Sequence, residues 1–128
     1  MAELSNYLEN ELYDHLLRNL AYTSPTTVYV ALYTDDPTDG DSGTEVTGGS
    51  YARQSVAFGA PANGAGDNSS DITFPTASAS WGTVTHIGLR DAVSGGNLLL
   101  HSALTASKTV GNGDTFKINA GDLDVSLA

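Results

Sequence analysis

The amino-terminal part of the chain places a leucine at every fourth position. The series comprises Leu4, Leu8, Leu12, Leu16 and Leu20, with Tyr13 and Leu17 beside it. This spacing puts the apolar side chains on one face of a helix, so we predict an amphipathic helix over residues 4–20. Ser5 or Asn6 can cap its start, because their side-chain oxygens accept backbone N–H groups. Ser24-Pro25 follows, and the residue before a proline disfavours helical geometry.

Beyond residue 25 the apolar pattern changes from a period of four to a period of two. Residues 27–33 carry Val28, Val30 and Leu32 on one face and aromatic or small apolar side chains on the other, which predicts a central strand. Further short strands are predicted at residues 51–58, 72–74, 83–90, 97–102, 105–110, 115–119 and 123–127. Gly95-Gly96 favours a hairpin turn, and residues 34–50 and 59–70 have the composition of loops.

One helix followed by about seven or eight closely spaced short strands predicts a mainly β fold. We expect an antiparallel β-sandwich or jelly roll with one N-terminal α-helix. No alternation of strands and helices suggests a parallel sheet. The 128 residues suit a single domain over 1–128, made of the helix at 4–20 and a β-sandwich at 26–128.

The charge balance narrows the classes of partner. The chain has 15 acidic and 5 basic side chains, for a net charge of −10, and the basic residues are scattered. Nucleic acid and anionic membranes are therefore not expected as partners. No apolar run reaches the roughly 20 residues of a membrane span, and residues 1–3 do not begin a secretory signal. We expect the protein to be made and to fold in a host cytoplasm. Zero cysteines exclude disulfides and thiolate chemistry.

The acidic loop at residues 34–50 superficially resembles a calcium-binding loop. Placing Gly40 at the sixth position of an EF-hand loop puts Pro37 third and Val46 twelfth, where side-chain oxygens are required. The motif therefore fails, and a solvated acidic loop is expected, with a weak calcium site of another kind as the alternative.

Histidines and serines do not form a recognisable reactive pattern. His86 and His101 lie on strands that could pair as a hairpin, but a zinc site needs at least three protein ligands and no third is indicated. There is no G-x-S-x-G elbow, and so many acidic residues guarantee some carboxylate pair by chance. We therefore expect no enzymatic activity, no cofactor and no bound metal; a small hydrolase of cell-surface polymers is a distant alternative.

The predicted helix suggests an interface. A helix cannot fit between two sheets, so it packs on an outer face, caps an open end or docks on another subunit. The candidate partner interface consists of Leu4, Tyr7, Leu8, Leu12, Tyr13 and Leu16. The six tyrosines and Trp81 either belong to the core or line a recognition face.

Several segments also resemble a known family. They read YLEN at 7–10, DHLLRN at 14–19, AYTSP at 21–25, VYVALYT at 28–34, DPT at 36–38, GGSYARQ at 48–54, THIG at 85–88 and GGNLL at 95–99. The chain resembles a family of small tailed-bacteriophage virion proteins, often labelled phage tail fibre proteins. The resemblance covers nearly the whole chain, and its motifs are structural rather than catalytic.

The resemblance implies a component of the virion. Related small β proteins act as cement or decoration proteins, which bind between capsid subunits and brace the shell. Our leading hypothesis is a capsid cement protein that binds the major capsid protein at the capsid surface, as a homo-oligomer (a dimer or trimer), because symmetry axes favour closed oligomers. The alternative is a tail-associated binding module in a fibre, baseplate or adaptor.

Overall fold

A computed structural model describes residues 2–127 of the chain. The described part contains one helix and nine strands, most of them short. In chain order these are β1 (Glu3–Leu4), α1 (Asn6–Leu17), β2 (Val28–Tyr33), β3 (Gln54–Val56), β4 (Ala65–Asp67), β5 (Ile72–Thr73), β6 (Gly82–Arg90), β7 (Leu98–Val110), β8 (Lys117–Ile118) and β9 (Asp124–Ser126).

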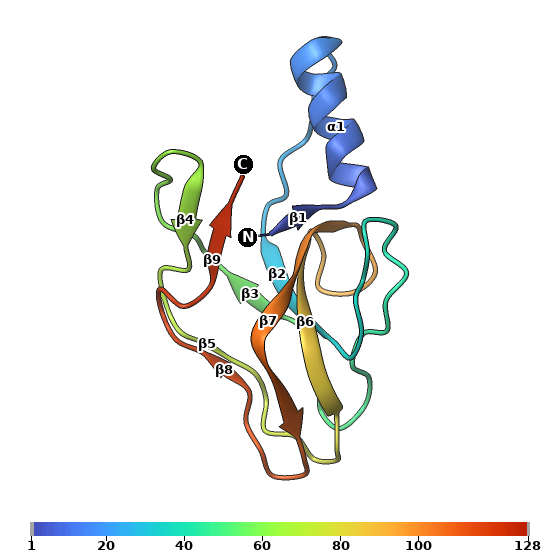
Figure 1. Cartoon of the computed structure of the whole chain (residues 1–128), viewed down its shortest axis with the longest axis vertical. Helices are drawn as coiled ribbons and strands as arrows, with labels where there is room; N and C mark the ends of the chain where they lie inside the picture. The colour runs from blue at the N-terminus through green and yellow to red at the C-terminus, as the bar shows by residue number, and fades with distance from the viewer. Residues whose placement is uncertain (1, 128) are drawn as a thin grey trace.

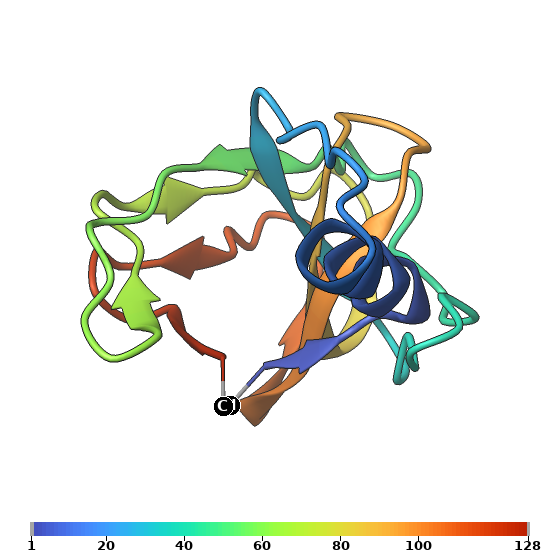
Figure 2. The ribbon, with the colours of Figure 1, turned by 90° about the horizontal axis from the view of Figure 1, so that it is seen from above.

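The strands form one larger sheet and two ribbons. The sheet has the order β1-β7-β6-β2-β3, and the ribbons are β4-β9 and β5-β8. Every strand pair is antiparallel. The sheet lies on one side of the molecule and the ribbons on the other, while α1 extends from one end (Figures 1 and 2). The prediction of a mainly β, antiparallel fold with one N-terminal helix is confirmed.

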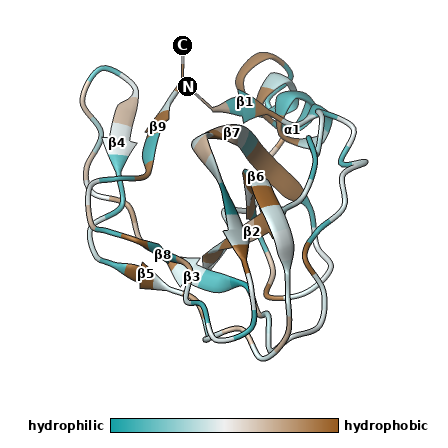
Figure 3. Cartoon of the chain, turned by 60° about the horizontal axis from the view of Figure 1, so that its bottom comes forward, coloured by the Kyte–Doolittle hydropathy of each residue, from teal (hydrophilic) through white to brown (hydrophobic). Residues whose placement is uncertain are grey.

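The hydrophobic core covers one face of the sheet. Val30 on β2 lies opposite Leu89 on β6, and Leu32 lies opposite Ile87. All four side chains are buried, as alternation along a half-buried strand requires. Hydrophobic segments of β2, β6 and β7 run through the middle of the sheet, whereas the connecting loops are mostly hydrophilic (Figure 3).

Aromatic side chains close the core opposite the sheet. Phe74 and Phe116 meet edge to face with their ring centres 5.6 Å apart. Tyr51 and Trp81 meet in the same way at 5.4 Å, and Trp81 Nε1 donates a hydrogen bond to the carbonyl of Gly49 at 2.9 Å. Edge-to-face contacts are a favoured arrangement for aromatic pairs, so this group fixes how residues 49–81 pass beneath the sheet.

The other face of the sheet, which we call the second face, carries polar and aromatic side chains. Tyr33, Arg90 and His101 lie on it, and all three are buried. Gly88 leaves the room that this packing needs, because a Cβ there would lie 2.7 Å from Leu98 Cδ1 and 2.8 Å from Tyr33 Cε2. The acidic loop and the start of α1 pack against this face.

The helix is shorter than the predicted range of 4–20. Ser5 is its N-cap, as expected, and its Oγ accepts the Leu8 N–H at 3.2 Å. Leu4 lies outside the helix in β1, paired with Leu100, because the edge of β7 offers hydrogen-bond partners to an extended segment. The helix also ends before Ser24-Pro25, since Asn19 adopts a left-handed conformation (φ 55°) that stops helical propagation.

The strand predictions need three further corrections. The separate strands expected at 97–102 and 105–110 are one strand, β7, which stays paired with β6 through a register shift between Val84 and His86. Residues 59–70 were expected to be a loop but contain β4. Strand β4 is held by backbone pairing with β9. It was not predicted because Gly66 and its neighbours show no alternating apolar pattern. Strands β3, β5, β8 and β9 are shorter than predicted.

Replacing Phe74 by alanine should destabilise the fold by about 3–5 kcal/mol, because the side chain is almost fully buried among other rings. Urea denaturation followed by far-ultraviolet circular dichroism measures the effect. Val93→Ala, at an exposed apolar position, is the control and should change stability by less than about 0.5 kcal/mol. Equal effects of the two substitutions would contradict this placement of the core.

Candidate docking interface

The base of α1 is fixed to the sheet by backbone and side-chain hydrogen bonds. The Ser5 N–H donates to the carbonyl of Leu99 at 2.9 Å, and the Ser5 hydroxyl donates to the carbonyl of Leu98. The Asn6 N–H donates to the carbonyl of Asp39 at 2.8 Å. Leu8, one turn further, is buried. The first turn of the helix is therefore held by β7 and by the acidic loop together.

The far half of α1 leaves the body of the protein. The helix projects beyond the end of the sheet in Figure 1. Large apolar side chains are exposed there: Tyr13 by 60%, Leu16 by 72% and Leu17 by 70% on the helix, and Leu20 by 45% just beyond its end. Tyr13 lies three and four residues from Leu16 and Leu17, which places these three on neighbouring positions of the helix surface. We call these four residues the apolar tip.

The structure divides the residues of the predicted partner interface. Leu8 is buried against the protein's own sheet, Leu4 lies in β1, and Tyr7 and Leu12 are half-buried. Only Tyr13 and Leu16 of the predicted set belong to the apolar tip. Leu17 and Leu20 were not predicted as interface residues, although they continue the same apolar stripe. The spacing of the apolar residues could have suggested Leu17 and Leu20 as well, but it could not show which end of the helix the sheet would cover.

Two arginines hold the acidic loop against the sheet. Arg90 is the last residue of β6, and Arg53 comes just before β3. Arg90 makes a bidentate pair with Asp41, both distances being 2.8 Å, and donates to the Tyr33 hydroxyl at 2.9 Å. Burial by itself would lower the pKa of Arg90, but the hydrogen bonds to Asp41 and Tyr33 outweigh it and the pKa is raised. Arg90 is therefore a permanent cation beneath the loop.

Arg53 holds the other end of the same loop. Its Nε and Nη2 donate to the two oxygens of Glu45 at 2.8 and 2.7 Å, and its Nη1 donates to the carbonyls of Ala92 and Gly95 at 2.9 Å. The Tyr51 hydroxyl adds a third hydrogen bond to Glu45 at 2.7 Å. Burial alone would raise the pKa of Glu45, but the bonds from Arg53 and Tyr51 lower it below its ordinary value.

The remaining carboxylates of the loop also bond inward. Asp35 accepts the Thr44 N–H at 2.6 Å, Asp36 accepts the Thr38 N–H at 2.9 Å, and Asp39 lies 2.8 Å from His101 Nε2. The loop is therefore at the surface, as predicted, but its charges have partners within the protein. The alternative of a calcium site within residues 34–50 loses Asp41 and Glu45, which the arginines occupy.

The two strand histidines are not brought together as metal ligands. His86 lies opposite Ala103 and contacts the Thr85 hydroxyl at 2.8 Å, whereas His101 lies opposite Gly88 and is buried beside Asp39. The aromatic side chains differ in their burial. Tyr33 and Trp81 are buried, and Tyr13 is the one aromatic residue among the large exposed apolar side chains of residues 2–127.

Among residues 2–127, no helix has the length and apolar character needed to cross a membrane.

The described chain is thus a β domain whose single helix carries exposed apolar side chains at its far end. The family model described as Podophage GP4 fiber I protein gp80 matches residues 3–126, so the chain belongs to this family of phage virion fibre proteins. No curated protein matches the chain significantly. The predicted resemblance to small phage virion proteins is confirmed.

The lowered pKa of Glu45 predicts an acid-sensitive fold. A carboxyl whose pKa is lower in the folded protein stabilises it above the unfolded pKa, near 4.5, and loses that contribution as the pH falls through the folded pKa. Glu45→Gln leaves the buried Arg53 guanidinium without its carboxylate, so it should cost about 3–5 kcal/mol at pH 7 and reduce the loss of stability below pH 4.5. Urea denaturation at several pH values measures both effects.

Asp14→Asn is the control for this experiment, because Asp14 forms an exposed ion pair with Arg18 at 2.8 Å. Such pairs contribute about 0–1 kcal/mol, so the control should keep the wild-type pH dependence. An unchanged acid dependence in Glu45→Gln would show that other carboxyls control it.

Proposed function

We propose that this protein is a structural component of the phage tail fibre apparatus and that it docks on another virion protein through the apolar tip of α1. The observation that carries the proposal is the pairing of a rigidly held helix base with an exposed apolar end. The proposal involves no catalytic activity, no nucleic acid and no membrane.

The energetics of the tip suit a multi-copy assembly. Burying a fully exposed Leu or aromatic side chain contributes about 1.5–3 kcal/mol, so four of them would contribute about 6–12 kcal/mol. The four tip residues are already partly covered, so the gain at the tip is smaller than this. Association itself costs about 4–15 kcal/mol, so one tip alone would bind weakly. Several copies held in one particle act together, because each bound copy raises the effective concentration of the next.

The charge of the chain supports the same assignment. The net charge of −10 keeps the free protein soluble despite its exposed leucines. Asp41 and Glu45, two of the five carboxylates of the acidic loop, are paired with arginines within the protein and are not free to meet a partner. Apolar contact at the tip is therefore the better supported mode of docking.

The family description favours a fibre over the capsid surface, but a cement role is the second candidate. The described chain is compact and has no extended repetitive shaft, which also suits a clip between major capsid subunits. Both roles place the protein in the virion and use the same tip. They differ in whether the partner is a tail protein or the major capsid protein.

The double variant Leu16→Asp/Leu17→Asp should fold normally and fail to enter particles. Both side chains are exposed, so the charges do not disturb the core, but a carboxylate cannot be buried in an apolar interface without a large cost. Complementation of a deletion phage, followed by quantitative mass spectrometry of purified virions, should show at least a tenfold loss of the protein.

Val93→Asp/Leu127→Asp is the matched control, because both residues are exposed apolar side chains outside α1. It should enter virions at the wild-type level. Equal incorporation of the two double variants would contradict docking through the tip. Wild-type fractionation of isolated heads and tails then separates the two candidates, since the cement role predicts the protein in the head fraction.

We also propose a homo-oligomer, a dimer or trimer. Strand β7 runs from Leu98 to Val110, and among residues 2–127 the β1 pairing covers Leu100 and His101 near the start of its outer edge. A long strand edge is a ready template for pairing with a second copy. Light scattering coupled to gel filtration should give two or three times the mass of one chain, and the mass of a single chain would contradict the proposal.

A further inference from the structure

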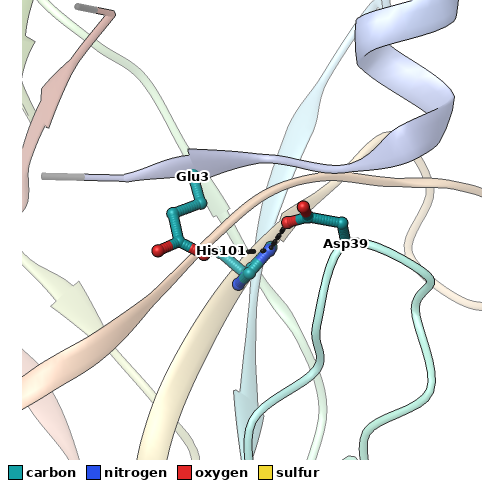
Figure 4. A group of neighbouring side chains, drawn as sticks. All are labelled: Glu3, Asp39 and His101. Carbon is teal, nitrogen blue, oxygen red and sulfur yellow. Dashed lines mark hydrogen bonds and ion pairs between the residues drawn. The ribbon is translucent and has the colours of Figure 1, made fainter.

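Three side chains from distant parts of the sequence meet at the base of α1. Glu3 comes from β1, Asp39 from the acidic loop and His101 from β7, and their ligand atoms all lie within 4.8 Å of one another. Figure 4 shows the two carboxylates approaching the imidazole from β1 and from the loop. His101 Nε2 lies 2.8 Å from Asp39 Oδ1 and 3.8 Å from Glu3 Oε2.

The backbone fixes this meeting. Glu3 is the register partner of His101 in the β1-β7 pair, so both residues lie on the same face of the sheet. Asp39 is held by its own carbonyl, which accepts the Asn6 N–H at 2.8 Å. The side chain of His101 is only 3% exposed, whereas those of Glu3 and Asp39 are 71% and 48% exposed. The cluster therefore has a buried imidazole at its floor and a solvent-accessible mouth.

The imidazole is oriented as in metal sites. Its Nε2 faces Glu3 and Asp39, while its Nδ1 lies 3.7 Å from Asp36 Oδ1. A ligating histidine commonly directs its second ring nitrogen toward a carboxylate, which fixes the tautomer and leaves a lone pair for the metal. The Asp36 carboxylate lies just outside hydrogen-bond distance of Nδ1, so a small side-chain movement would bring it into that outer role.

The spacing of the ligand atoms fits a small cation. Metal–ligand bonds of about 2.0–2.1 Å in a tetrahedral site place neighbouring ligand atoms about 3.3 Å apart. The observed separations of 2.8 and 3.8 Å lie on either side of this value. A neutral imidazole can donate its Nε2 proton to one acceptor, whereas a divalent cation accepts lone pairs from the imidazole and both carboxylates at once.

We propose that Glu3, Asp39 and His101 form a binding site for one divalent transition-metal ion of the zinc class, with water completing the coordination. The imidazole nitrogen favours zinc and its neighbours over calcium and magnesium, which prefer all-oxygen sites. The ion would join β1, the acidic loop and β7, and so fix the base of the helix that carries the apolar tip. The site is independent of where the protein sits in the particle.

Isothermal titration of the untagged full chain, freed of metal with EDTA, tests the site directly. Zinc chloride should bind at one ion per chain and raise the melting temperature, while magnesium and calcium chloride at the same concentration should do neither. Cobalt(II) should give the intense visible absorption of a four-coordinate site. His101→Gln, Asp39→Asn and Glu3→Gln should each weaken zinc binding at least tenfold.

His86→Gln is the control, because His86 lies on the neighbouring strand but outside the cluster. It should bind zinc as the wild type does. Glu3 is exposed, so Glu3→Gln provides a variant that keeps its fold if His101→Gln does not. Failure of the wild type to bind zinc, or undiminished binding by both Asp39→Asn and Glu3→Gln, would overturn the proposal; in either case the cluster is a hydrogen-bonded histidine among carboxylates.

Discussion

Arg53 and Arg90 bind the acidic loop to the protein through bidentate pairs with Glu45 and Asp41. Both guanidinium groups are largely removed from water, with side chains 8% exposed. Leaving either of them without its carboxylate would cost several kcal/mol, so the pairs constrain the loop strongly even though their net contribution to stability is modest. The loop's path over the second face follows from these two contacts.

The position of the helix depends on this loop. Asp39 accepts the Asn6 N–H at the start of α1 and contacts His101, while Ser5 bonds to the backbone of β7. The first turn is thus caught between loop and strand, and the remainder of the helix has no sheet beneath it. A soluble domain normally covers large apolar side chains, so the exposed tip is the observation on which the proposed docking rests.

The sequence predicted those features that side-chain periodicity encodes. The stripe of leucines announced α1, and the alternation of Val28, Val30 and Leu32 announced β2. It could not reveal β1 or β4, because two or three residues held by backbone pairing carry no pattern of their own. Leu4 is an example: its spacing fits the helical pattern, but the residue lies in β1, paired with the edge of β7.

The candidate site was predictable in kind but not in extent. Periodicity predicts an interface on the helix, which stays a prediction, and only the structure shows that Leu8 is buried and that Leu17 and Leu20 are exposed. The cluster of Glu3, Asp39 and His101 could not be predicted from the sequence, because its members are separated by up to 98 positions. The β1-β7 register brings Glu3 to His101, and the path of the acidic loop brings Asp39. The inward pairing of the acidic loop was hidden for the same reason.

Cryo-electron microscopy of the intact virion tests the central claim most directly, at a resolution that traces α1. The account predicts that the density of this chain lies in the tail, with Tyr13, Leu16, Leu17 and Leu20 buried against a neighbouring protein. Density over the capsid lattice with the tip buried would support the cement role in place of the tail role, and docking through the helix would still hold. A helix tip facing solvent in every copy would contradict the account.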